Sequence, residues 1–160
     1  MVNMTDNEAS IVDESAFSVR RTIRIAAPID KVWQAVAEPQ HISRWFGTTV
    51  LDGAGVGATG TMTFPDYGSI PLRVEAKEEP NLITYRWNND DAQSERPNGI
   101  DEETSTVFTF TLEDLGGETQ LTVVESGFER TSDPLANLES HRTGWNDELD
   151  KMVALVESGA

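Results

Sequence analysis

The chain has 160 residues, a length typical of a single folded domain. Its 28 aspartate and glutamate residues outnumber its 12 lysine and arginine residues, so the formal net charge is −16 at pH 7. Such an acidic surface repels phosphate, and we expect no binding to nucleic acid or to anionic membranes. The absence of cysteine excludes disulfides, zinc–thiolate sites, iron–sulfur clusters and cysteine nucleophiles.

The first fifteen residues are polar and contain four acidic side chains but no basic one. This composition predicts an acidic disordered tail over residues 1–15, followed by one folded domain over residues 16–158. It is also unlike a secretory signal peptide, which starts with basic residues. No apolar run is long enough to cross a membrane, so we expect a cytoplasmic protein.

Residues 17–25 alternate between apolar and polar side chains, which predicts a strand with one face in water, although Arg21 falls on the apolar side. Pro28 suits the first turn of a helix. Apolar residues then recur at i, i+3, i+4 and i+7, namely Ile29, Val32, Trp33 and Val36. Pro39 ends this helix, and a second short helix is expected over residues 39–46.

The segment from Gly47 to Ser126 has the pattern of strands and turns. Strands rich in β-branched and aromatic residues are expected at 61–64, 71–76, 82–87, 104–112 and 119–125. Gly116-Gly117 predicts a hairpin turn between the last two strands. Residues 88–103 hold six acidic residues and one arginine, and this composition indicates a long, mobile loop.

The C-terminal segment predicts a long amphipathic helix. Asp133 and Pro134 form a typical helix start. Residues then recur on one face to about Glu157: Leu138, Arg142, Trp145, Leu149, Met152 and Val156. Gly144 lies inside this helix, where glycine is unfavourable, and we expect it to allow a close approach of the helix to the sheet or to a ligand.

This order of elements predicts an α+β fold. A curved antiparallel sheet of about six to seven strands would wrap around the long C-terminal helix, with two short helices after the first strand. The strand connections are too short for parallel crossovers. A bent sheet around one helix leaves space between them, and that space is a natural ligand cavity.

Several short motifs together resemble those of the START-like (SRPBCC) superfamily, and in particular the homologues of the heat-shock protein 90 ATPase activator. The motifs are Arg21-Thr-Ile23, Ala27-Pro28, Val32-Trp33, Pro39, Trp45, Gly47, Leu82-Ile-Thr-Tyr85-Arg-Trp87, residues 106–112 and 119–123, Ser126-Gly127-Phe128 and His141-x-x-Gly144-Trp145 with Leu149. The resemblance covers nearly the whole chain from Phe17 onward. It implies a helix-grip fold with a cavity between the sheet and the C-terminal helix.

The chain departs from that family pattern at two places. Phe46 stands where the family often has a second tryptophan, and the loop over residues 88–103 is long and unusually acidic. The eukaryotic co-chaperone also carries a separate N-terminal chaperone-binding domain, for which this chain is too short. This departure argues against a direct chaperone role.

Motifs for catalysis or cofactor binding are weak. Residues 55–60 match G-x-G-x-x-G, but a strand-like segment follows where a dinucleotide site needs a helix, so we interpret them as a flexible turn. His41 and His141 are the two histidines, and neither has a second histidine at metal-ligand spacing. No nucleophile elbow or H-E-x-x-H motif is present. We expect no cofactor and no metal, and we assign no catalytic residue.

Aromatic residues are the main candidates for a ligand cavity. The candidate lining residues are Trp33, Trp45, Phe46, Phe64, Tyr85, Trp87, Phe108, Phe110, His141, Trp145 and Leu149. Ordinary core packing is the alternative, but tryptophan and tyrosine carry polar atoms that suit a half-wet pocket. Arg21, Arg73 and Arg142 interrupt or adjoin apolar stripes. They form internal ion pairs or, alternatively, anchor an acidic group of a ligand.

Three functions follow from these observations. The first is a non-catalytic binding protein that holds a small hydrophobic or aromatic, lipid-like molecule in the cavity between sheet and helix. The second is a stress-related module that regulates a chaperone partner, which the resemblance and the acidic surface favour. The third is an enzyme of the cyclase or hydrolase type, in which His141 would be the reachable histidine. The oligomeric state is left open.

Overall fold

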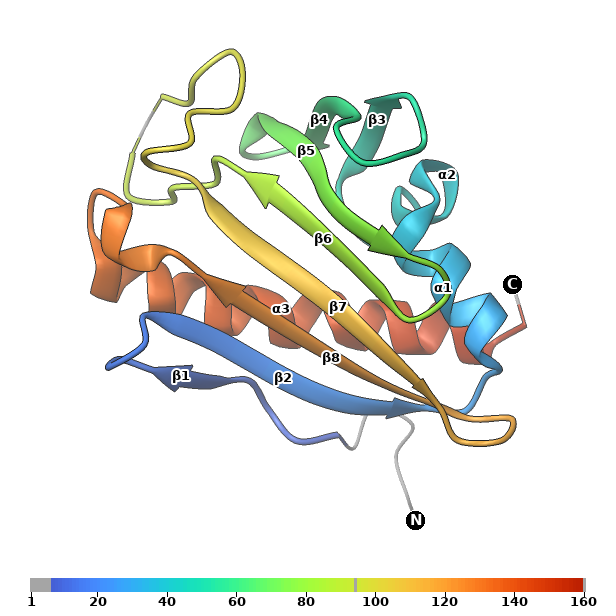
Figure 1. Ribbon diagram of the computed structural model, residues 1–160. Coiled ribbons are helices and arrows are strands. Elements are labelled where there is room, and N and C mark those ends of the chain that lie inside the picture. The colour runs from blue at the N-terminus through green and yellow to red at the C-terminus, as the bar shows by residue number, and fades with distance from the viewer. Residues whose placement is uncertain (1–6, 94, 160) are drawn as a thin grey trace.

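The computed structural model describes residues 7–93 and 95–159, which form one eight-stranded antiparallel sheet with helices on its concave side (Figure 1). The strand order is β1-β2-β8-β7-β6-β5-β4-β3. The elements are β1 (Ile11–Asp13), β2 (Ser18–Ile25), α1 (Ile29–Ala37), α2 (Pro39–Ile42), β3 (Thr48–Asp52), β4 (Thr59–Phe64), β5 (Gly68–Glu78), β6 (Leu82–Trp87), β7 (Thr106–Asp114), β8 (Thr119–Ser126), the 3-10 turn η1 (Phe128–Arg130) and α3 (Pro134–Glu157). The sequence prediction of an α+β helix-grip fold is confirmed.

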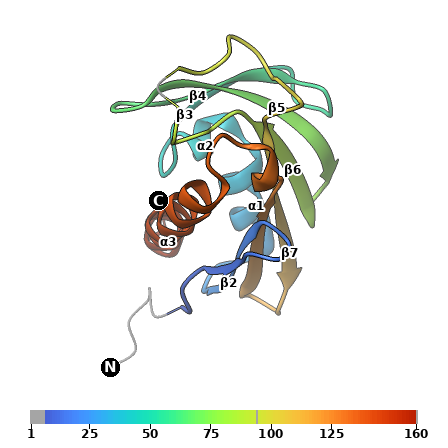
Figure 2. The ribbon, with the colours of Figure 1, turned by 90° about the vertical axis from the view of Figure 1, so that its left-hand side faces the viewer.

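The long helix α3 lies within the curve of the sheet. Figure 2 looks nearly along α3 and shows the strands bending around it, with α1 and α2 beside it. Buried residues of α3 recur every three or four positions, so one face of the helix packs into the core: Leu138, His141, Trp145, Leu149, Met152, Val153 and Val156. The helix begins at Pro134, and the side chain of Asp133 accepts a hydrogen bond from the backbone of Ala136, as expected of an N-cap. Among the described residues, no helix is both long and apolar enough to cross a membrane.

The N-terminal segment differs from the sequence prediction. The expected disordered tail is wrong for residues 11–13, because they form the edge strand β1 and pair with Ser18–Arg20 of β2. Ser10 donates hydrogen bonds from both its backbone and its hydroxyl group to Oδ1 of Asn146 on α3, at 2.7 and 2.9 Å. Three residues, of which Ile11 and Val12 are apolar and Asp13 is acidic, give too short a pattern to predict such a strand. Residues 1–6 of the expected tail lie outside the described residues.

Two other elements also differ from expectation. The strand β3 was not predicted, and with β1 it brings the sheet to eight strands instead of about six to seven. The short helix α2 ends at Ile42, and residues 43–47 continue as turns where a helix to Phe46 was expected. The predicted hairpin turn is present: Gly116 and Gly117 have φ angles of 80° and 97°, which glycine adopts without strain.

Candidate functional site

A pocket of about 220 Å³ lies between α3 and the β4–β6 part of the sheet. Aromatic side chains form much of its wall: Phe46, Phe64, Tyr67, Trp87 and Trp145. Polar and small residues complete it: Asn89, Asp91, Ser140, His141, Gly144, Asp147 and Glu148, together with the apolar Ile70. The space exceeds the roughly 150 Å³ cavity that accommodates benzene, so one ring-sized group fits.

The aromatic wall is brought together from four separate elements. Phe46 follows α2, Phe64 ends β4, Trp87 ends β6 and Trp145 lies in the middle of α3. The ring centre of Phe46 is 5.5 Å from that of Phe64, 5.7 Å from that of Trp87 and 5.5 Å from that of Trp145. Phe46 therefore joins the aromatic groups of sheet and helix, and Tyr67, which is 61% exposed, stands at the solvent side.

Gly144 leaves the helix side of the pocket open. A Cβ atom added at Gly144 would meet no heavy atom within 4 Å, so the expected close approach of helix to sheet is not the reason for this glycine. Gly144 is one of the residues that line the pocket, and its neighbours one turn away, His141 and Glu148, line it too. The missing side chain contributes to the empty volume.

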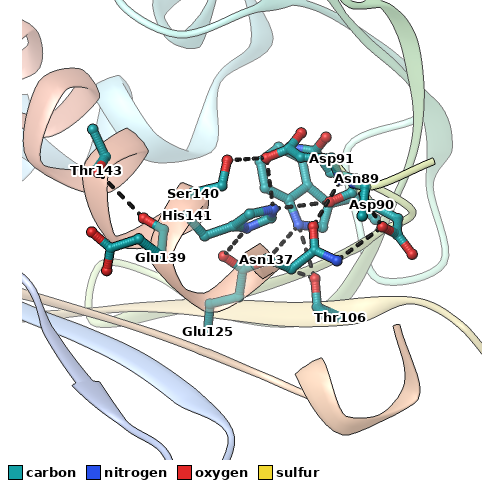
Figure 3. A network of polar contacts seen from close by, with 12 residues as sticks. Asn89, Asp90, Asp91, Thr106, Glu125, Asn137, Glu139, Ser140, His141 and Thr143 are labelled. Atoms are coloured by element: carbon teal, nitrogen blue, oxygen red, sulfur yellow. Dashed lines mark hydrogen bonds and ion pairs between the residues drawn. The ribbon is translucent and has the colours of Figure 1, made fainter. Parts of the chain in front are cut away.

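The carboxylate of Glu125 on β8 lies next to Trp87 and Trp145 and is fully buried, with an exposed fraction of 0%. One oxygen, Oε2, accepts hydrogen bonds from Trp87 Nε1 at 2.8 Å and Thr106 Oγ1 at 2.6 Å. The other, Oε1, accepts from Trp145 Nε1 at 2.9 Å. Oε1 also lies 2.7 Å from His141 Nδ1 (Figure 3). Every donor that surrounds this carboxylate is a side chain, and two of them are the pocket tryptophans.

The imidazole of His141 connects Glu125 to the loop after β6. Its Nδ1 faces Glu125, while its Nε2 lies 2.9 Å from the carbonyl oxygen of Asn89 and 3.4 Å from Asp91 Oδ2. Burial alone would lower the pKa of His141, but the attraction of Glu125 and hydrogen bonds to Asp91 and Glu125 raise this pKa to about 10. Both ring nitrogens therefore carry protons at neutral pH, and both protons are donated to fixed acceptors.

The carboxylates of this network stay ionised. Burial alone would raise the pKa of Glu125, but the charge and hydrogen bond of His141 and the hydrogen bonds of Thr106 and Trp87 lower it. For Asp91, burial again opposes ionisation, while His141, the Ser140 hydroxyl and Arg96 lower its pKa. The group as a whole is an imidazolium held between two carboxylates.

The start of the acidic loop is fixed to α3, in contrast to the mobile loop that the sequence indicates. Asp90 Oδ1 accepts hydrogen bonds from the Ser132 hydroxyl at 2.9 Å and from Asn137 Nδ2 at 2.9 Å. Asn137 Oδ1 in turn accepts the backbone N–H of Asp91 at 2.8 Å (Figure 3). These contacts hold Asn89 and Asp91 at the pocket.

Of the eleven expected lining residues, five lie in the pocket wall: Phe46, Phe64, Trp87, His141 and Trp145. The other six are buried core residues that do not line this pocket: Trp33, Trp45, Tyr85, Phe108, Phe110 and Leu149. Trp45 Nε1 donates to the carbonyl of Ala35 at 2.8 Å, and the Tyr85 hydroxyl donates to that of Val36 at 2.7 Å. Their polar atoms thus cap free carbonyl groups at the end of α1.

The three arginines considered as ligand anchors do not line the pocket. Arg21, which is 3% exposed, donates to Asp150 at 2.8 Å and to the backbone carbonyl of Asn146 at 3.1 Å, between β2 and α3. Arg73 pairs with Glu75 and Glu102, and Arg142 pairs with Glu139 on its own helix. Each has a carboxylate partner, in agreement with the internal ion pair that the sequence favours over a ligand anchor.

Sequence reasoning missed Glu125, although a signal for it existed. Residues 119, 121, 123 and 125 of β8 alternate inward, so Glu125 shares the face of Leu121 and Val123. An acidic residue on an apolar face predicts a buried charge with partners. Tyr67, Asn89 and Asp91 lie in turns and loops, where no periodicity could have identified them. Within the described residues, no cluster of histidine and acidic residues is suited to hold a metal ion.

Comparisons with known proteins agree with this fold. The family model for Activator of Hsp90 ATPase homolog 1-like protein matches residues 26–157. The solved structure of MLL2253 from Mesorhizobium loti has a TM-score of 0.71 at 24% identity, covering 89% of this chain and 98% of that protein. DynU16, a protein in the dynemicin biosynthetic locus, has a TM-score of 0.70 at 25% identity, covering 89% of this chain. This chain spans about half of DynU16, 48% of its length.

The Aha1 dimer from Colwellia psychrerythraea has the same fold, with a TM-score of 0.67 at 22% identity, covering 88% of this chain and 96% of that protein. A search of curated protein sequences finds no significant match.

Proposed function

The chain belongs to the family of Activator of Hsp90 ATPase homolog 1-like proteins, and we propose that within this family it is a non-catalytic binding protein. Its ligand is a small molecule with an apolar, aromatic part. The observation that carries the proposal is the pocket between sheet and α3, which has aromatic walls and an unfilled position at Gly144. Concave sites with apolar walls and a few polar groups are typical of small-molecule binding.

The state of His141 favours binding over catalysis. A general base needs a free lone pair, but both nitrogens of His141 donate to fixed acceptors and its pKa is raised to about 10. Glu125 is fully buried behind Trp87 and Trp145, so its carboxylate faces indole N–H groups and not the pocket. The geometry therefore gives no support to a cyclase or hydrolase mechanism through His141.

The test is a thermal-shift screen against aromatic and hydrophobic metabolites, with hits verified by quenching of tryptophan emission. A ligand at 100 times its dissociation constant should stabilise the native state by about 2.7 kcal/mol. The matched variants are Gly144→Leu, which places a side chain in the pocket, and Thr143→Leu, which adds the same side chain at an exposed neighbouring position. Binding that Gly144→Leu abolishes and Thr143→Leu preserves would support the proposal. Equal affinities of the two variants would contradict it.

A second candidate is a module that regulates a chaperone partner. Membership of this family favours it, and a net charge of −16 would steer a basic partner surface toward the chain. The experiment is a titration with the heat-shock protein 90 of the same organism at low and high salt. Salt-sensitive association that Gly144→Leu leaves unchanged would favour this candidate over the small-molecule pocket.

A further inference from the structure

We propose that the pocket selects organic cations, such as a quaternary ammonium or an aromatic amine with a ring-sized apolar part. This inference rests on the proposed ligand-binding function and adds the charge of the ligand. Three features carry it: the way the tryptophans are oriented, the acidic side chains of the pocket, and the way the nearby cationic groups are already paired.

The orientation of Trp87 and Trp145 suits a positive charge. The indole N–H is the positive edge of tryptophan, and both N–H groups point at Glu125, at 2.8 and 2.9 Å, instead of into the pocket. Their ring carbons, which carry the π electrons, are therefore the atoms through which these residues line the pocket. Hydrogen bonds to a carboxylate polarise the donor group, which pushes electron density into the rings. A cation over the face of an aromatic ring is attracted to its π electrons, and tryptophan is the best partner.

Acidic side chains stand around the same pocket. Asp147 and Glu148 lie one turn beyond Gly144 on the pocket side of α3, and Asp91 reaches the pocket from the loop after β6. Asp147 is exposed and forms no ion pair among the described residues of the chain. Glu148 pairs with Lys151 at 2.7 Å, but the Lys151 side chain is 58% exposed. Exposed pairs contribute little to stability, so a ligand cation can replace that ammonium group at small cost.

The cationic groups near the pocket are paired, apart from the Nε atom of Arg96, which is buried without a hydrogen-bond partner among the described residues. His141, the cationic residue among those that line it, donates one proton to Glu125 and one to Asn89. Arg96 lies outside the lining, where its guanidinium contacts the carbonyl of Tyr67 at 2.8 Å and Asp91 at 3.7 Å. No lining group is thus left to neutralise an anionic ligand, while three carboxylates repel one.

The test compares three probes of nearly equal shape: benzyltrimethylammonium, uncharged neopentylbenzene and anionic phenylmethanesulfonate. Dissociation constants are measured by quenching of tryptophan emission for the wild type, Gly144→Leu and the double variant Asp147→Asn/Glu148→Gln. The control double variant, Asp52→Asn/Glu113→Gln, removes the same charge from exposed strand positions outside the pocket.

We expect benzyltrimethylammonium to bind at least about tenfold more tightly than phenylmethanesulfonate. The double variant at positions 147 and 148 should weaken binding of the cation about tenfold and leave neopentylbenzene within about twofold, whereas the control should change neither. Raising NaCl from about 50 to about 500 mM should weaken binding of the cation alone, because salt screens exposed charges.

Two other outcomes separate this inference from the proposed function. Binding of neopentylbenzene with equal or higher affinity than the cation, insensitive to the change at positions 147 and 148 but lost in Gly144→Leu, would overturn the cation preference and keep the ligand pocket. Failure of all three probes to bind at millimolar concentration would overturn the inference and count against the pocket as well.

Discussion

Replacing Glu125 with glutamine should strongly destabilise the protein. The fully buried carboxylate accepts hydrogen bonds from Trp87, Thr106 and Trp145 and faces protonated His141. A glutamine amide has one oxygen and one NH₂ group. Because an indole N–H, which can only donate, faces each carboxylate oxygen, the NH₂ group must oppose at least one donor whichever way it is turned. The variant also leaves His141 without its nearest negative charge.

The expected loss in the free energy of unfolding at pH 7 is about 3–5 kcal/mol, the usual cost of removing one partner of a buried ion pair. The raised pKa of His141 gives a similar upper bound for this loss in the free energy of unfolding. A rise from 6.5 to about 10 corresponds to about 5 kcal/mol of stabilisation of the charged form, since one pKa unit equals about 1.4 kcal/mol. A typical domain has about 5–15 kcal/mol in total, so the variant keeps little stability.

The pH dependence has a definite sign. The pKa of His141 in the folded state lies above its unfolded value, so its contribution is fully present below about pH 6.5 and is lost as pH rises through about 10. The pKa of Glu125 is lowered on folding, so its contribution is present above the ordinary value of 4.5 and is lost as the pH falls below it. The wild type should therefore lose stability between pH 6.5 and 10, and Glu125→Gln should lose much less.

Urea denaturation followed by circular dichroism at several pH values measures both effects. Glu113→Gln, which changes an exposed carboxylate on β7, is the control and should alter stability by less than about 0.5 kcal/mol. A loss below about 1 kcal/mol for Glu125→Gln, or the same pH slope as the wild type, would refute the energetic role of this buried network.

Three further changes have clear expected outcomes. Gly144→Ala should raise the Tm by a few degrees, because alanine favours a helix by up to about 1 kcal/mol and its Cβ meets open space; an unchanged or lower Tm by calorimetry would contradict that open space. Arg21→Met should cost about 2–3 kcal/mol in urea denaturation, because the charged hydrogen bonds of Arg21 to Asp150 and to the Glu8 carbonyl are lost. The affinity of the Arg21→Met variant for pocket ligands should equal that of the wild type. A large drop in this affinity would instead favour a role for Arg21 in anchoring the ligand. Asn137→Ala should release the loop at Asp90 and Asp91, seen as faster amide hydrogen exchange there than in the wild type, and unchanged exchange would mean that other contacts hold the loop.

Periodicity in the sequence was sufficient for the architecture. The apolar stripe from Leu138 to Val156 predicts α3, and Asp133 with Pro134 predicts its correct start. The alternating strands predict the central part of the sheet. The edge strands β1 and β3 were missed because three to five residues of mixed polarity give little pattern, and their pairing depends on neighbours distant in sequence.

The sequence by itself determined which face of each element is buried, whereas the tertiary structure decided what each buried side chain meets. Tyr85 and Trp87 share the inward face of β6, yet the Tyr85 hydroxyl reaches the end of α1 while Trp87, two residues later, reaches Glu125 and the pocket. A repeat of two residues in a strand, or of 3.6 in a helix, specifies the face on which a side chain lies. It carries no information about which other element packs against that face. The pocket exists because a curved sheet and a helix with a glycine at position 144 do not fill the space between them.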